Sequence, residues 1–158
     1  METVIATKDG WVELGDIELT QSRPLLDSRS FGIIRIETIE GRLLDEQLGG
    51  VDVDDLWDDV IHACADLASN GSGTVPAGEW DVTVRPQRVG YDVTIAVRNE
   101  NITKVGRCRA PDLFDAVYIE ASRFWKAWHR HPHDTSALET VRLHTTHLGR
   151  LGGGASHA

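Results

Sequence analysis

The sequence is poor in cysteine and has no long apolar run. Its two cysteines, Cys64 and Cys108, lie far apart and in no CxxC pattern, so a disulfide framework is not indicated and a reducing compartment fits best. No segment reaches the roughly 20 consecutive apolar residues that a membrane-spanning helix needs. The first residues also lack the basic and apolar regions of a secretory signal. We therefore expect a cytoplasmic protein without a membrane partner.

Common catalytic motifs are also missing. The chain contains no GxSxG, no GxxxxGK[ST] and no HExxH. These absences argue against a serine esterase, a P-loop nucleotide site and a zinc protease of the HExxH type. They favour a protein that is not an enzyme.

The composition is sufficient for one globular domain. The chain has 158 residues, of which 41% are hydrophobic and 26% charged, and it includes five tryptophans. We expect a single domain over residues 1–148 and a flexible glycine-rich tail over residues 149–158. Only three lysines accompany thirteen arginines, which we interpret as typical of a GC-rich bacterial genome.

The net charge of −9 is unevenly distributed along the chain. Residues 1–81 contain 18 acidic and 5 basic residues, a balance of −13, whereas residues 82–158 contain 7 and 11, a balance of +4. This asymmetry predicts an electrostatic dipole if the two halves occupy different surfaces. Nucleic-acid binding is not expected, because a phosphate backbone requires a concentrated basic face.

Hydrophobic periodicity predicts an α+β fold with the element order β-β-β-α-β-β-β-α and a possible short C-terminal helix. The strands are expected in a hairpin around Lys8-Asp9-Gly10 and over residues 31–40, 80–86, 91–98 and 102–108, and the helices over about 54–69, 112–130 and 136–151. The glycine-rich stretch over residues 70–78 predicts a loop. Short turns between consecutive strands predict one antiparallel sheet of about five to six strands, with the two main helices packed on one face.

The clearest local signal is the alternation of apolar and polar residues in the pair of strands over 80–86 and 91–98. The apolar members should face one core, and they are Trp80, Val82, Val84, Tyr91, Val93, Ile95 and Val97. The helix over 54–69 should present a stripe to the same core, formed by Leu56, Trp57, Val60, Ile61, Cys64, Leu67 and Ala68.

A histidine cluster is the sharpest candidate for metal chemistry. In an extended segment, His129, His131 and His133 would point to one side and could bind Zn²⁺ with one position open for water. Further ligands or supporting groups could come from Asp134, His144 and His147. The alternative, which we favour, is a solvated helix end whose cationic histidines suit the negative end of the helix dipole. No cofactor is therefore expected, with zinc as the alternative.

An acidic run is the candidate surface for binding a partner. Its members are Asp45, Glu46, Asp52, Asp54, Asp55, Asp58 and Asp59. An EF-hand calcium loop is excluded, because Trp57 and Ala63 occupy the positions that require glycine and glutamate. Two interpretations stay open. The part of the run from Asp52 to Asp59 is either the solvated face of a helix capped by Asp52 or Asp54, or an anionic patch for a basic partner.

Two further groups are better explained by packing than by function. Cys108 lies between Arg107 and Arg109, which could lower its thiol pKa, but no base for a cysteine nucleophile can be identified. Cys64 falls on the apolar helix stripe, where a core position is expected. The aromatic residues of the second helix, which are Phe124, Trp125 and Trp128, could form a recognition patch, although their helical spacing favours the core.

These observations lead to one functional hypothesis with two alternatives. The chain is expected to be a non-enzymatic protein-binding module, of the immunity or inhibitor type, whose acidic segment meets a basic partner. The first alternative is a small metal-dependent enzyme or metal-binding domain that uses the histidine cluster. The second is a structural subunit of an oligomer or phage particle that uses the aromatic helix as its interface.

Overall fold

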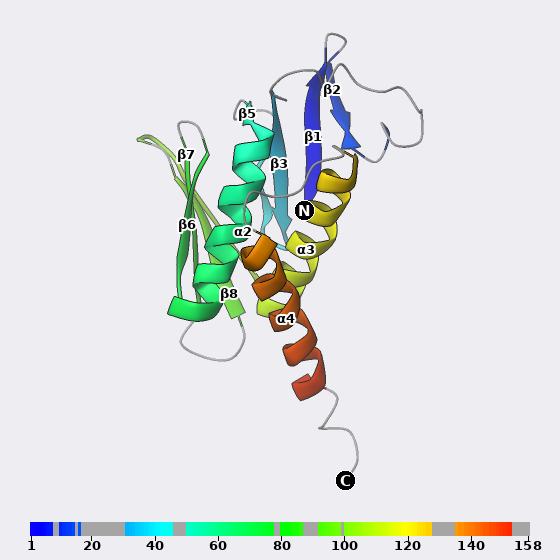
Figure 1. Cartoon of the computed structure of the whole chain (residues 1–158). Helices are drawn as coiled ribbons and strands as arrows, with labels where there is room; N and C mark the ends of the chain where they lie inside the picture. Colours follow the sequence, from blue (N-terminus) through cyan, green and yellow to red (C-terminus); the bar gives the residue numbers. More distant parts are fainter. Residues whose placement is uncertain are drawn as a thin grey trace.

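A computed structural model describes residues 1–7, 10–14, 16, 31–45, 50–77, 80–86, 92–98, 100–127 and 135–152. The α+β prediction is confirmed: antiparallel strands and three helices form the described part (Figure 1). The strands differ from the prediction in number and arrangement, because the described part has nine strands in two separate sheets. The strands that precede the first long helix pair among themselves, and so do those that follow it, so this helix separates the two sheets along the chain.

The first sheet has the strand order β2-β1-β3-β4, and β5 pairs with β3 beside this path. Its strands are β1 (Glu2–Thr7), β2 (Gly10–Glu13), β3 (Phe31–Thr38), β4 (Gly41–Leu44) and β5 (Val51–Asp52). The predicted N-terminal hairpin is confirmed by the antiparallel register of β1 and β2, although residues 8 and 9 lie outside the described part.

One arginine connects three strands of this sheet. The Nη1 atom of Arg35 in β3 lies 2.5 Å from Glu2 Oε2 in β1 and 2.8 Å from Glu13 Oε1 at the end of β2. The Arg35 side chain is largely buried, whereas both carboxylates are partly exposed. The guanidinium therefore balances two acidic residues of the N-terminal half within the fold.

The second sheet has the order β6-β7-β8-β9, and all its pairs are antiparallel. Its strands are β6 (Gly73–Ala77), β7 (Trp80–Pro86), β8 (Asp92–Arg98) and β9 (Thr103–Arg109). The alternation prediction is confirmed for its described valine and isoleucine members, because Val82, Val84, Val93, Ile95 and Val97 are buried. The Trp80 side chain and Tyr91 lie outside the described part.

The prediction of a loop over residues 70–78 is wrong for β6, which pairs with β7 and buries Val75.

The three described helices are α2 (Val53–Asn70), α3 (Ala110–Ala127) and α4 (Thr135–Gly152). Asp52 occupies the N-cap position of α2, but its side chain makes no capping hydrogen bond. Gly71 ends the helix with φ of 83°, and its backbone N–H donates to the Leu67 carbonyl oxygen over 3.1 Å. Only glycine adopts this left-handed conformation without cost.

Helix α4 includes residues 149–152, which were expected to belong to the flexible tail. Residues 153–158 lie outside the described part.

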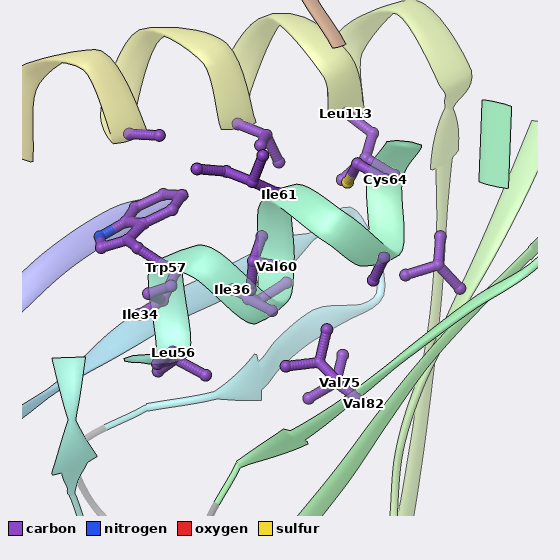
Figure 2. Close-up of a cluster of buried hydrophobic side chains, with 14 of the residues drawn as sticks. Ile34, Ile36, Leu56, Trp57, Val60, Ile61, Cys64, Val75, Val82 and Leu113 are labelled. Atoms are coloured by element: carbon purple, nitrogen blue, oxygen red, sulfur yellow. The ribbon is translucent and has the colours of Figure 1, made fainter. Parts of the chain in front are cut away.

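The core is built around α2, which contacts both sheets and both other helices. Figure 2 shows side chains from β3, the second sheet and α3 surrounding this helix. The predicted apolar stripe is confirmed, since all its members are buried apart from Ala68, which packs against the core while half-exposed. Within the stripe, Trp57 is fully buried and its indole Nε1–H donates to the Thr3 hydroxyl of β1 over 3.2 Å.

The two sheets meet where the turn between β3 and β4 approaches β9. Gly106 in β9 has no room for a side chain, because a Cβ there would lie 2.8 Å from Thr38 Cγ2 and 2.9 Å from Leu43 Cδ1. Beside it, Glu40 accepts hydrogen bonds from the Arg107 backbone N–H and from Arg107 Nε, both over 3.0 Å. We call this contact the Glu40–Arg107 joint.

No helix in the described part combines the length and the apolar character that a bilayer crossing requires.

Candidate functional site

The structure divides the predicted acidic segment into buried and accessible carboxylates. Asp54 and Asp58 are only 9% and 7% exposed, so the interpretation of a solvated helix face is wrong for these two, and Asp45, which follows β4, is 6% exposed. The reason is helical geometry, because Asp54 and Asp58 lie one turn apart on the side of α2 that also carries buried Ile61. Glu46 lies outside the described part, and Asp52 is half-buried.

The accessible carboxylates of α2 form a stripe along one face of the helix. Asp55, Asp59 and Asp66 occur at spacings of four and seven residues, which places them on the same side, and His62 lies between them. We call these three aspartates the α2 acidic stripe. The helix contains five aspartates and no lysine or arginine, so His62 is the one residue of α2 that can carry a positive charge beside the stripe.

The pKa of the Asp59 carboxyl is raised, chiefly by burial. The charges of Asp55 and Asp58 raise this pKa further, while His62 lowers it. Within the described residues, none of the three stripe carboxylates forms an ion pair, although Asp66 accepts a hydrogen bond from Asn70 over 3.3 Å. The stripe therefore holds like charges at a cost that a cationic partner would relieve.

The residues of the histidine cluster are not among those that the structure describes. His129, His131 and His133, together with Asp134, lie outside the described part, as do the side chains of His144 and His147. Among the residues that are described, no three histidine, cysteine or acidic side chains come together as a potential metal site. Zinc binding by the cluster stays a hypothesis.

The two cysteines are free thiols in different surroundings. Burial raises the pKa of Cys64 to about 12, with a smaller contribution from Cys108, so Cys64 is a core residue as expected. Cys108 is half-buried and packs against the core, whereas its neighbours Arg107 and Arg109 are exposed. Strand alternation thus directs both arginines to the other face of the sheet.

The aromatic residues of α3 belong to the core where they are described. Phe124 and Trp125 are buried, and their rings pack edge to face with centroids 4.9 Å apart. Phe124 also approaches Trp57 of α2, at 6.4 Å between ring centroids. The core interpretation is therefore correct for Phe124 and Trp125, and Trp128 lies outside the described part.

Two surface hollows were not anticipated from the sequence. The first, of about 400 Å³, lies on the outer face of β7 and β8 and is lined by Asp81, Thr83, Arg85, Thr94, Ala96 and Arg98. The second, of about 710 Å³, lies beside the Glu40–Arg107 joint and includes Cys108 and Asp112. The polar positions of the strand alternation were visible in the sequence, but their pairing across the sheet was not.

The Glu40–Arg107 joint makes stability dependent on pH. Hydrogen bonds from the backbone and side chain of Arg107 lower the pKa of Glu40 from its usual 4.5 to about 2. Because the folded-state pKa is lowered, the stabilisation by Glu40 is complete above about pH 4.5 and is lost as the pH falls towards 2.

We therefore expect Glu40→Gln to lower the free energy of unfolding at pH 7, by an amount that shrinks between pH 4.5 and pH 2. Urea unfolding of both proteins across this range measures the difference. Glu100→Gln removes an exposed carboxylate elsewhere and serves as the matched control. A stability difference that stays constant down to pH 2 would show that the joint does not hold Glu40 ionised.

Comparisons with models of protein families, with curated proteins and with solved structures find no match to this chain.

Proposed function

We propose that this chain is a non-enzymatic protein-binding module, of the immunity or inhibitor type, which presents the α2 acidic stripe to a basic surface of its partner. The observation that supports the proposal is the stripe itself. Three accessible carboxylates lie on one face of a helix that contains no lysine or arginine. The opposite face of the same helix is anchored in the core, so the carboxylates are held on a rigid support.

Such a surface acts mainly on the rate of encounter. Exposed charges are screened by salt and contribute little each to equilibrium stability, but together they steer an oppositely charged partner. Association should therefore be fast at low ionic strength and slower when salt is added. The carboxylates Asp45, Asp54 and Asp58 are not part of this proposed surface, because their side chains are buried.

The test neutralises the α2 acidic stripe without touching the buried carboxylates. We expect the triple variant Asp55→Asn, Asp59→Asn, Asp66→Asn to associate with the natural partner roughly tenfold more slowly at about 50 mM salt, because steering by exposed charges acts on the association rate. The partner is first captured from the source cells with the wild-type chain and identified by mass. Association and dissociation rates are then measured by surface plasmon resonance.

A matched control separates the stripe from the overall charge. The variant Glu37→Gln, Glu100→Gln, Asp115→Asn removes three exposed carboxylates outside α2 and changes the net charge equally. It should associate at nearly the wild-type rate. Equal slowing by both triple variants would mean that only net charge matters, and an unchanged rate in the stripe variant would remove the proposed surface. Melting temperatures confirm that both variants fold.

A further inference from the structure

The outer face of the second sheet has no helix packed on it within the described part. Helix α2 covers the inner face, where Val75, Val82 and Val84 are buried, and Figure 1 shows the described helices on one side of this sheet. Alternate residues point the other way, and Asp81, Arg85 and others are exposed there.

The register of β7 and β8 arranges these outward side chains in three cross-strand pairs, which we call rungs. Asp81 lies opposite Arg98, Thr83 opposite Ala96, and Arg85 opposite Thr94. All six line the hollow of about 400 Å³. Small side chains therefore form its floor in the middle rung, and each outer rung contributes one guanidinium. Val105 of β9 lies opposite Ala96 and is 51% exposed, so it extends the floor with an apolar surface.

The lining of the hollow has a net positive charge, from two arginines and one aspartate. Arg85 and Arg98 form no ion pair with another described residue, and the lining contains one carboxylate, Asp81. Arg107 and Arg109 lie on the same outward side, at the adjacent strand β9. A chain with a net charge of −9 could neutralise such arginines within its own fold, as Arg35 is neutralised by two glutamates. Within the described part Arg85 and Arg98 have no such partner, unlike Arg107, which pairs with Glu40, and this indicates a site for an external anion.

We infer that this hollow binds an extended acidic segment of a protein, with two carboxylate side chains four residues apart. Arg85 and Arg98 belong to rungs that are four residues apart along the strands, which corresponds to about 13 Å. In an extended peptide, residues i and i+4 are also about 13 Å apart and point to the same side. Each carboxylate can then pair with one guanidinium, while the side chain at i+2 lies over the small floor.

The two ends of the hollow are not equivalent. Asp81 lies opposite Arg98 and repels an incoming carboxylate there, whereas Arg85 lies opposite the hydroxyl of Thr94. The Arg85 end should thus hold its carboxylate more tightly. Nucleic acid fits less well, because its phosphates are densely spaced and the chain as a whole repels a polyanion.

The test uses labelled peptides and the full chain. Fluorescence anisotropy at about 50 mM salt measures binding of fluorescein-labelled SEATAES, in which the two glutamates are four residues apart. The comparison peptide SEATEAS has the same composition but a spacing of three, which places the carboxylates on opposite sides of an extended chain. We expect SEATAES to bind with a Kd below about 1 mM and SEATEAS more weakly.

Variants of the chain identify the hollow as the binding site. Arg85→Gln and Arg98→Gln should each weaken SEATAES binding about five- to tenfold, and Asp81→Asn should strengthen it. Arg42→Gln removes an exposed arginine of β4 in the first sheet and serves as the control for net charge. The triple variant of the α2 acidic stripe should bind SEATAES at least as tightly as wild type, so this inference can fail or succeed independently of the proposed function.

Four outcomes would overturn the inference. They are no binding of SEATAES up to about 1 mM, equal binding of the two peptides, equal weakening by Arg42→Gln, and tighter binding of a single-stranded oligonucleotide than of SEATAES. The last result would assign the face to nucleic acid. Full displacement of SEATAES by an equal concentration of inorganic phosphate would reduce the hollow to a general anion site. Circular dichroism of each variant establishes that a loss of binding is not a loss of fold.

Discussion

Replacing Trp57 by alanine should lower the free energy of unfolding by about 3–5 kcal/mol. Trp57 is fully buried at the centre of the core and packs near Phe124, as Figure 2 shows for its position on α2. Alanine would remove the indole and leave a cavity between α2, β1 and α3. Because domains of this size have only about 5–15 kcal/mol of total stability, the variant should melt about 10 °C or more below wild type.

A double-mutant cycle separates the loss of packing from the loss of the hydrogen bond. Trp57→Phe keeps an aromatic ring but removes the indole N–H, and Thr3→Val removes its acceptor. Each single variant leaves one buried polar group unpaired at about 1–3 kcal/mol, so the double variant should cost less than the sum of the two. Strict additivity in urea unfolding would show that the Trp57–Thr3 bond does not stabilise the fold.

Replacing Gly73 by alanine should be nearly as damaging, although it adds only one methyl group. A Cβ at Gly73 would overlap the carbonyl oxygen of Ala63 and lie 2.6 Å from its carbonyl carbon. These are backbone atoms of α2, so they cannot relieve the overlap by a change of rotamer, as a side chain could. Strand β6 must therefore move away from the helix, and we expect a loss of about 3 kcal/mol in the free energy of unfolding.

Gly71→Ala is the matched control for this substitution. It makes the same chemical change two residues earlier, where no atom lies within 4 Å of an added Cβ. Its cost should be only about 1 kcal/mol, because alanine must adopt the left-handed backbone at φ of 83°. If Gly73→Ala were no more destabilising than Gly71→Ala in thermal or urea unfolding, the close contact between β6 and α2 would be disproved.

Elements with regular periodicity were predictable from the sequence. The alternation in β7 and β8 identified their buried faces, because period-two hydrophobicity on consecutive strands has one structural explanation. The apolar stripe of α2 was equally clear. Strand β6 was missed, because Gly73 and Pro76 within it are typical of loops. It becomes a strand through pairing with β7, which overrides local preference.

The candidate surfaces were less predictable, because they depend on how distant segments are placed. A helical wheel would have shown that Asp54 and Asp58 lie beside Ile61, and this would have separated them from Asp55 and Asp59. The hollow on the second sheet had no comparable signal. Its six residues alternate with core positions in two strands, but only the register reveals that Arg85 and Arg98 bracket small side chains.

The Glu40–Arg107 joint also bears on how the protein avoids self-association. Strand β9 is at the edge of its sheet, and an edge strand with free backbone N–H groups is a template for pairing with another chain. The Glu40 carboxylate accepts a hydrogen bond from the backbone N–H of Arg107, so this N–H is not available to another chain. The tight packing of Gly106 against Thr38 and Leu43 holds the turn between β3 and β4 beside β9. We therefore expect the loss of this carboxylate to lower the melting temperature only slightly. Its larger effect should be to increase the aggregation of concentrated protein during storage.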